Sequence, residues 1–202
     1  MSPESVSLDK GSSEKVFDTK KPVIIEAAIH LFSEKGIKAT TVKDIARKAD
    51  VAEGTLYRHW KGKNELAQEI FYENMKRFKE ELEEGLDGVV GTKNKLRKAI
   101  VGIYVFAGKD PLLYKFLILS SHYELRGMLS RTPKPLEVII EIVREGVVSG
   151  DLKPIELPLA GAIIVGTITK LSDFKRMGVL EKDLDAYIDP VTEILWNALK
   201  AG

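Results

Sequence analysis

The segment from Lys20 to Lys63 constrains the fold of this 202-residue chain more than any other part. It contains three short patterns of apolar residues at helical spacing, each bounded by residues that begin or end helices. The members of the first pattern are Ile24, Ala27, Ala28, Leu31 and Phe32. Gly36 follows where this helix should stop. Three helices within about 40 residues are therefore predicted.

The second and third helices are short and lie close together in the sequence. Thr41 and Asp44 have the spacing of a capping box, so the second helix should begin at Thr41. After a turn at Asp50, the third helix should direct Leu56 and Trp60 inward at i and i+4. Two short helices joined by a tight turn are typical of the helix-turn-helix motif, whose second helix enters the major groove of DNA.

The charge of this segment agrees with that interpretation. Between Lys20 and Lys63 there are ten Lys and Arg against five Asp and Glu, a net charge of +5, whereas the whole chain carries only +1. Basic residues are thus concentrated where DNA phosphates would lie. The alternative is a basic three-helix unit that serves only as a packing module.

Three sequence pieces carry a resemblance to a known family. They are IIEAAIHLFSEKG, TTVKDIARKADV and GTLYRHWKGKNEL, and they occur in order at the separations found in the family. The segment Lys20–Leu66 resembles the DNA-binding domain of the TetR family of transcriptional regulators. Asp50 stands where the family usually has glycine, and a turn with positive φ tolerates Asp less well than Gly. Trp60 replaces a usual phenylalanine, which we interpret as only a larger core residue.

The resemblance implies which residues contact DNA. The glycine, threonine and tyrosine of the family's recognition helix approach DNA, and these roles fall to Gly54, Thr55 and Tyr57. Arg58 and His59 match variable positions of the recognition helix. Lys61 and Lys63 match positions after that helix that contact phosphates, and Thr41 and Lys43 match contacts from the second helix. Arg58 is the best candidate to bind guanine through two hydrogen bonds, and a solvated arginine is the alternative.

The remainder of the chain is predicted to be entirely helical. No segment alternates with a period of two, so we expect an all-α protein of about nine helices. A long helix from Asn64 to Glu84 should link the two parts, and Pro190 should bend the last helix, Glu181–Leu199. The expected domains are a flexible tail (1–19), a helix-turn-helix DNA-binding domain (20–66) and a helical ligand-binding and dimerisation domain (67–202).

Aromatic residues of the second half suggest a small-molecule site. TetR-like proteins hold an inducer in this domain, and ligand sites between helices are mostly apolar with few polar groups. For each aromatic residue the alternative is ordinary core packing. The lining candidates are Met75, Phe78, Tyr104, Tyr114, Leu117, His122 and Tyr123. We hypothesise a mainly hydrophobic effector, because no basic cluster or acidic array in this half indicates a charged one.

The last two helices have the composition of an interface. Along LAGAIIVGTITKL, apolar and small residues cover most of the helix circumference, which is more than one subunit core should bury. Gly161, Ala162, Gly166 and Thr167 would allow another helix to approach closely. Burial within a monomer is the alternative. TetR-like proteins dimerise through their last two helices, so the resemblance implies a homodimer that matches palindromic DNA.

Several other protein classes are excluded. The chain has no cysteine, and His30, His59 and His122 lie in three different helical segments. There is also no Gly-rich phosphate loop, so neither a metal, a cofactor nor an enzymatic activity is expected. No apolar run is long enough to span a bilayer and no signal peptide is visible, so a soluble cytoplasmic protein without membrane contact is expected.

The function that these features favour is transcriptional regulation. We expect a repressor that is released from double-stranded palindromic DNA by a small-molecule effector. The alternative is a ligand-independent DNA-binding protein, either sequence-specific or architectural. An architectural protein would need a basic C-terminal half or tail, and this chain has neither.

Overall fold

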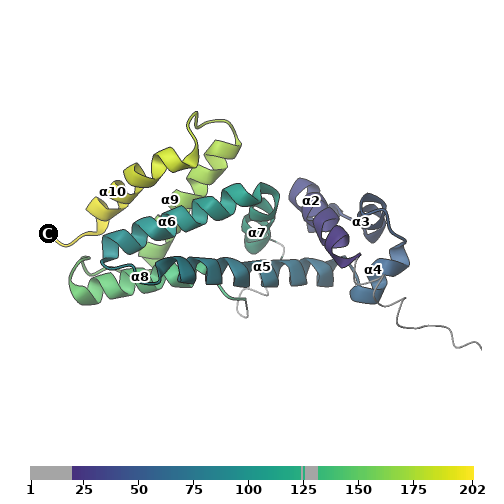
Figure 1. Cartoon of the computed structure of the whole chain (residues 1–202), viewed down its shortest axis with the longest axis horizontal. Helices are drawn as coiled ribbons and strands as arrows, with labels where there is room; N and C mark the ends of the chain where they lie inside the picture. The colour runs from purple at the N-terminus through teal and green to yellow at the C-terminus, as the bar shows by residue number, and fades with distance from the viewer. Residues whose placement is uncertain (1–19, 124, 126–131) are drawn as a thin grey trace, which may run out of the picture. The chain divides into compact units, whose positions relative to one another are not determined.

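The computed structural model describes residues 20–123, 125 and 132–202, and the side chains of all of these except 119–123. Within these residues the protein is all-α, as predicted, with nine α-helices, one 3-10 helix and a single isolated β-bridge (Figure 1). The elements are α2 (Lys21–Ala39), α3 (Val42–Lys48), α4 (Glu53–His59), α5 (Lys63–Leu86), α6 (Thr92–Lys109), α7 (Pro111–Tyr123), α8 (Pro135–Ser149), α9 (Leu157–Arg176), η2 (Leu184–Tyr187) and α10 (Ile188–Leu199). The proposed tail, 1–19, lies outside the described residues.

The described residues form two units. The first unit comprises the described residues of 1–71 and 115–126, and the second comprises those of 72–114 and 127–202. Helix α5 begins in the first unit and ends in the second, and α7 is likewise divided between them. Each unit has its own buried apolar residues, as a separate core requires.

Helix α2 begins the first unit and ends as its sequence predicts. Ile24, Ala28 and Phe32 lie on its buried face. Gly36 has φ of 81° and ψ of 164°, which interrupts the helical backbone and leaves only a short turn before Thr40. Because positive φ is easily adopted only without a Cβ, glycine suits this stop. The Thr40 hydroxyl donates a hydrogen bond to the Gly36 carbonyl at 2.8 Å and fixes the turn.

The start of α5 completes the core of the first unit. Leu66, Ala67 and Phe71 are fully buried. The rings of Phe71 and Phe32 both contact the ring of Phe116 on α7, with centroid distances of 6.5 Å and 5.7 Å. These aromatic contacts join α2, α5 and α7 within the unit.

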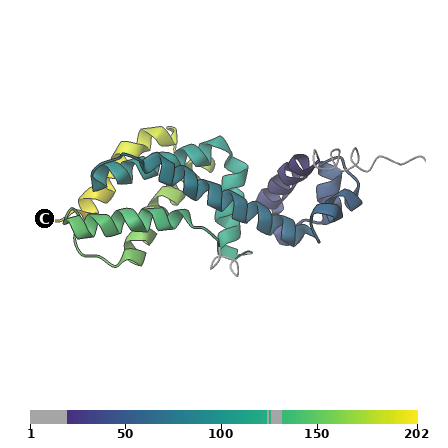
Figure 2. The ribbon, with the colours of Figure 1, turned by 60° about the horizontal axis from the view of Figure 1, so that its bottom comes forward.

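The second unit is a bundle in which α6 is the common partner. Helix α8 packs against α9 and α6, and α10 packs against α6 (Figure 2). Two glycines allow close approach. A Cβ at Gly102 of α6 would lie 2.6 Å from Leu82 of α5, and a Cβ at Gly146 of α8 would lie 2.6 Å from Thr92.

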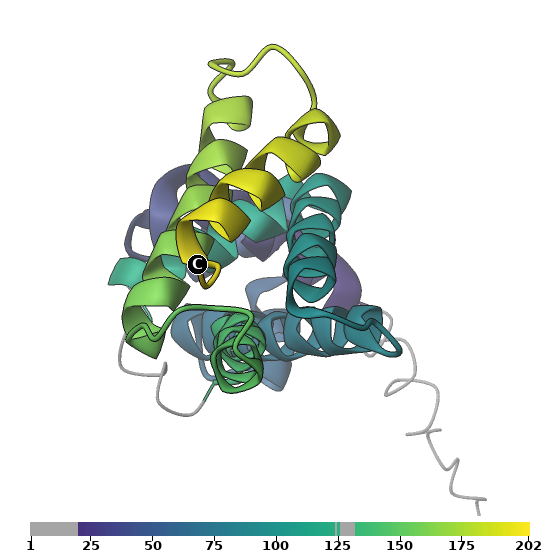
Figure 3. The ribbon, with the colours of Figure 1, turned by 90° about the vertical axis from the view of Figure 1, so that its left-hand side faces the viewer.

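The last helical segment differs from the prediction. Instead of one bent helix over Glu181–Leu199, the chain forms η2 and then α10 (Figure 3). Pro190 lies in the first turn of α10, where its missing N–H would have had no partner in the helix. The predicted bend at Pro190 is therefore wrong, because the proline lies near a helix start and not in a helix interior.

Candidate nucleic-acid interface and ligand-binding core

Helices α3 and α4 form a helix-turn-helix in the first unit. Ile45, Ala46 and Leu56 are buried between them, and the Val51 amide donates to the Ala46 carbonyl at 3.0 Å in the turn. Asp50 has φ of 52° and is the only residue other than glycine with positive φ in the described parts of the chain. The turn therefore has the left-handed geometry that the family's glycine would adopt, and Asp is among the few other residues that tolerate it.

Helix α4 buries one side and exposes the other. Leu56 and Trp60 are buried, as predicted, whereas Tyr57 is 54% exposed. Gly54 and Arg58 are also exposed, and nothing lies within 4 Å of the position of a Cβ on Gly54. The backbone at Gly54 can therefore approach a flat surface, such as the wall of a DNA groove, closely. Gly54, Tyr57 and Arg58 thus lie on one accessible surface.

Two other candidates on α4 are less accessible. Thr55 and His59 are half-buried. The His59 ring lies 5.3 Å from the Trp60 ring, centroid to centroid, and its Nε2 is buried without a hydrogen-bond partner in the described structure. His59 therefore contributes to the packing of the helix end as well as to the candidate surface.

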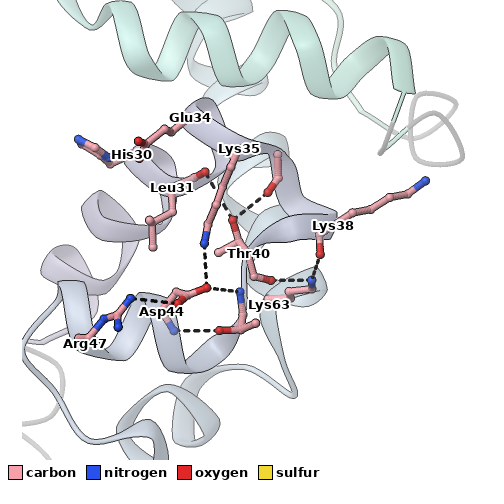
Figure 4. A network of polar contacts seen from close by, with 11 residues as sticks. His30, Leu31, Glu34, Lys35, Lys38, Thr40, Asp44, Arg47 and Lys63 are labelled. Atoms are coloured by element: carbon pink, nitrogen blue, oxygen red, sulfur yellow. Dashed lines mark hydrogen bonds and ion pairs between the residues drawn. The ribbon is translucent and has the colours of Figure 1, made fainter.

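Thr41 and Asp44 hold the start of α3, and the contacts of the Asp44 carboxylate with Lys35 and Arg47 can be followed in Figure 4. The Asp44 amide donates to Thr41 Oγ1 at 3.0 Å, and the Thr41 amide donates to Asp44 Oδ2 at 3.1 Å, which is the predicted capping box. Lys35 donates to the same carboxylate at 2.9 Å, and Arg47 does so at 3.2 Å. Hydrogen bonds from Lys35 and Thr41 hold the pKa of Asp44 far below its ordinary value. Since the Thr41 hydroxyl accepts in the cap, its proton remains available to a phosphate.

Lys63 has a structural role that the sequence did not indicate. Its Nζ donates to the carbonyl of Lys38 at 2.8 Å and to that of Thr40 at 2.6 Å (Figure 4). These carbonyls belong to the last turn of α2 and to its C-cap residue, where a positive charge is favourable. An ammonium has three protons, so one remains for a phosphate contact. The other two lysine candidates, Lys43 and Lys61, have exposed side chains.

Trp60 does more than fill the core, so the interpretation of it as only a larger core residue is wrong. Its indole Nε1 donates to Glu69 Oε2 on α5 at 2.7 Å, and Lys21 Nζ on α2 pairs with Glu69 Oε1 at 2.8 Å. Lys21 Nζ also lies 5.6 Å from the centre of the Trp60 ring. Burial raises the pKa of Glu69, but hydrogen bonds from Lys21 and Trp60 outweigh it and lower this pKa. The end of α4 is thereby tied to α2 and α5.

The structure places the ligand-binding candidates in different surroundings. Phe78, Tyr104 and Tyr114 are buried in the second unit, and Met75 is half-buried there. The Phe78 ring stacks on Phe106 with a centroid distance of 4.0 Å. Leu117 is buried in the first unit. The side chains of His122 and Tyr123 lie outside the described residues.

Two tyrosine hydroxyls in the second unit are buried and form no hydrogen bond with the residues that the structure describes. They belong to Tyr104 on α6 and Tyr114 on α7, whose side chains are buried. Burial raises the pKa of Tyr104 to about 12, and it raises the pKa of Tyr114 to about 12 although the nearby Ser172 hydroxyl partly opposes the rise. Buried hydroxyls normally have partners, so each of these two is a candidate hydrogen-bond donor to a bound molecule.

A groove on the surface of the second unit has a different chemistry. Its volume is about 350 Å³, and its lining residues are Lys79, Glu83, Leu86, Lys95, Glu137, Val138, Glu141, Ile142 and Glu145. Lys79 Nζ lies 3.1 Å from Glu137, and Lys95 pairs with Glu145. The charges of the groove are largely paired with each other, so it does not suit an apolar ligand.

Helices α9 and α10 expose apolar side chains. On α9, Leu159 is 52% exposed and Ile163 is 41% exposed, and on α10 Ile194 is 66% exposed. Gly166 lies three residues after Ile163 on α9, with nothing within 4 Å of the position of its Cβ. Of the described helices, α9 is also the one long and apolar enough to cross a membrane by length and composition, although only 28% of it is buried. A large apolar face on a helix of this kind indicates a protein partner as readily as a lipid one.

The fold and the exposed α4 surface define a class of protein. The chain combines a basic helix-turn-helix unit with a separate helical unit whose core contains two unpaired tyrosine hydroxyls in the described structure. This is the organisation of a DNA-binding regulator that responds to a ligand. A family model described as bacterial regulatory proteins, tetR family, matches residues 24–70. The fatty acid metabolism regulator protein of Bacillus subtilis (strain 168) is 30% identical over 181 residues, which are 87% of this chain and 93% of that protein. The chain belongs to the TetR family of transcriptional regulators.

Solved structures agree with this assignment. The transcriptional regulator FadR from Bacillus subtilis, crystallised in complex with stearoyl-CoA, has a TM-score of 0.72 at 30% identity, over 86% of this chain and 96% of that one. The fatty acid degradation regulator FadR from Bacillus halodurans has a TM-score of 0.72 at 25% identity, over 88% and 94%. These relatives are regulators, and the chain is accordingly a DNA-binding regulator and not an enzyme.

Proposed function

We propose that this protein is a cytoplasmic homodimeric repressor that binds a palindromic operator and is released by a long-chain acyl thioester of coenzyme A. The observation that carries the DNA-binding part is the accessible surface formed by Gly54, Tyr57 and Arg58 on α4 of a basic helix-turn-helix. The ligand class is supported by the stearoyl-CoA complex of the Bacillus subtilis regulator, which is 30% identical over most of this chain.

DNA recognition would combine two kinds of contact. Arg58 would bind base edges, because a guanidinium matches the two acceptors of guanine in the major groove. Lys43, Lys61 and the free protons of Thr41 and Lys63 would meet phosphates, which fix the register of the helix but do not distinguish sequences. Tyr57 would place its ring on the domain surface and its hydroxyl on the backbone.

The dimer would form through the exposed faces of α9 and α10. Leu159, Ile163 and Ile194 are apolar and exposed, and Gly166 leaves room for a second helix. A two-fold axis between the copies would present two α4 helices to half-sites about 34–36 Å apart, which is one turn of DNA. An inverted repeat is the sequence that such a symmetric pair recognises.

Release would follow from a difference in ligand affinity between two conformers. Helix α5 is continuous from Lys63 to Leu86 and belongs to both units, so a ligand in the second unit has a rigid element through which to act. The ligand can shift the equilibrium only by its difference in affinity for the two conformers, typically about 1–3 kcal/mol. The conformer that it favours would hold the two α4 helices at a separation that does not fit adjacent major grooves.

Selection of bound DNA from a random pool is the test of this proposal. The expected product is an inverted repeat, and titration of the selected duplex with stearoyl-CoA should release the protein. Failure to prefer an inverted repeat over scrambled DNA at moderate ionic strength would contradict the regulator as proposed. Preference for the repeat without any effect of stearoyl-CoA would instead support the ligand-independent, sequence-specific alternative.

A further inference from the structure

Tyr104 and Tyr114 carry a feature that core packing does not explain. Both side chains are more than nine-tenths buried, yet neither hydroxyl has a hydrogen-bond partner in the described structure. A phenylalanine would fill the same space without the cost of removing a hydroxyl from water. Two such hydroxyls in one unit therefore indicate a partner that is bound from outside the chain.

The two hydroxyls lie in one neighbourhood. Charge on Tyr114 would raise the pKa of Tyr104, and the Ser172 hydroxyl on α9 lies near enough to Tyr114 to lower the pKa of Tyr114, although burial outweighs this effect. The Ser172 hydroxyl donates to the Ile168 carbonyl at 3.1 Å within its own helix, so its proton is already used. The free donors at this place are thus the two phenol protons, which come from α6 and α7.

The charge of the surroundings favours a neutral acceptor over a carboxylate. No Lys, Arg or His is buried among the residues that the structure describes. Asp173, which lies near enough to Tyr114 to raise its pKa, pairs with Arg176 at 3.0 Å. A buried carboxylate would lack a cationic partner here and would be repelled by Asp173. A carbonyl oxygen, by contrast, needs only donors.

We infer that Tyr104 and Tyr114 donate hydrogen bonds to the thioester carbonyl of a fatty acyl chain bound in the second unit. This inference rests on the proposed function, because it names the atoms that recognise the proposed ligand. The apolar pair Phe78 and Phe106 in the same core suits the hydrocarbon part of such a ligand. The two phenols make the site selective for a chain that carries an acceptor at a fixed position.

The test compares stearoyl-CoA with S-octadecyl-CoA, a thioether that lacks the carbonyl, and with stearate. Calorimetry would measure binding to the wild-type protein, to the double variant Tyr104→Phe/Tyr114→Phe and to Tyr72→Phe, which removes an exposed hydroxyl. The wild type and Tyr72→Phe should prefer the thioester over the thioether by about tenfold or more. The double variant should bind both CoA compounds alike and should melt at the same or a higher temperature, since it loses two unsatisfied groups.

The outcomes separate the inference from the proposed function. An undiminished preference for the thioester in the double variant would overturn the role of the tyrosines and leave the ligand class intact. Tighter binding of stearate than of stearoyl-CoA, lost in the double variant, would overturn the neutral-carbonyl assignment. If the wild type bound none of the three compounds, the ligand class itself would be wrong, whatever the variants did.

Discussion

Arg58 and Lys61 allow base recognition and phosphate binding to be measured separately. Replacing Arg58 with Ala should relax the preference at one base position by about 1–3 kcal/mol, because two hydrogen bonds to a guanine edge would be lost. Lys61→Ala should weaken operator and random DNA alike and reduce the salt slope by about 1. Binding titrations on both DNAs at several salt concentrations measure these effects, and an unchanged base preference without Arg58 would contradict its assignment.

Lys63 is a less suitable residue for that experiment. Its ammonium donates to the carbonyls of Lys38 and Thr40, so Lys63→Ala should lower the stability of the first unit as well as its phosphate affinity. The exposed Lys61 side chain has no such role in the described structure, and its backbone amide, which bonds Glu65, is unaffected by the substitution.

Asp44 predicts how the first unit responds to acid. Lys35 and the capping box lower its folded-state pKa, so its contribution to stability is complete above the unfolded value of about 3.9 and is lost as pH falls through the lower folded value. The stability difference between the wild type and Asp44→Asn should therefore be constant from pH 7 to about pH 5 and should shrink below about pH 4. Urea unfolding of both proteins across this pH range measures the stability difference. A difference that grew as the pH fell would contradict a lowered folded-state pKa of Asp44.

At the scale of elements, the contact between Trp60 and Glu69 fixes the end of the recognition helix. Trp60→Phe keeps an aromatic residue in the core, and Lys21 remains a partner of Glu69. The substitution removes the indole Nε1 that donates to Glu69 Oε2 at 2.7 Å. We expect a loss of about 1.5–3 kcal/mol in the free energy of unfolding, the range for hydrogen bonds to charged groups, and weaker operator binding. Chemical denaturation and operator titration are the measurements.

Trp196 provides the matched control for this prediction. It is the second tryptophan of the chain, lies half-buried on α10 and makes no indole hydrogen bond in the described structure. Trp196→Phe should affect the first unit little. Equal losses of operator affinity in the two variants would argue against a specific role for the Glu69 contact, whereas Glu69→Gln, which keeps an acceptor for the indole, should be milder than Trp60→Phe.

Gly166 tests the proposed dimer face on α9. Because nothing lies within 4 Å of its Cβ position, Gly166→Leu should leave the subunit folded and should even raise its helix propensity. A leucine there would block close approach of a second helix, so light scattering should show 22.5 kDa monomers where the wild type gives twice that mass. Operator affinity should fall with the dimer. A variant that stayed dimeric and bound its operator would show that the copies meet elsewhere.

Gly161 on the same helix supplies the contrast. A Cβ there would lie 3.0 Å from Leu136 of α8, so Gly161→Leu should disturb the α8 and α9 packing within one subunit. We therefore expect loss of subunit stability from Gly161→Leu and loss of assembly from Gly166→Leu. The two glycines, five residues apart, would thus report on opposite faces of one helix.

At the scale of the whole molecule, DNA and ligand binding must be coupled in both directions. If stearoyl-CoA lowers operator affinity by a given factor, operator DNA must lower the affinity for stearoyl-CoA by the same factor, typically about 5–150-fold. Ligand titrations with and without a saturating operator duplex measure this. Equal ligand affinities in the two titrations, together with release of DNA by the ligand, would contradict an equilibrium coupling between the two sites.

Much of the first unit follows from local sequence. The break at Gly36, the capping box of Thr41 and Asp44, and the inward positions of Leu56 and Trp60 each depend on residues at most four positions apart. Helical spacing and capping act over that same distance, which is why the sequence predicts them. The error at Pro190 has the opposite origin, because the position of a helix start within a longer helical pattern depends on packing.

The partners of polar groups that lie far apart in the sequence follow only from the packing of the helices. Lys63 donates to two carbonyls at the C-terminal end of α2, Lys21 and Trp60 both contact Glu69, and the hydroxyls of Tyr104 and Tyr114 are buried without partners in the described structure. The spacing of apolar residues along the sequence does not predict these contacts, because they arise from the way whole helices pack. The helical class and the helix-turn-helix motif, in contrast, can be predicted without the structure, because both depend on short-range spacing. Helix packing determines which buried hydroxyls have no partner in the described structure and which apolar residues of α9 and α10 are exposed.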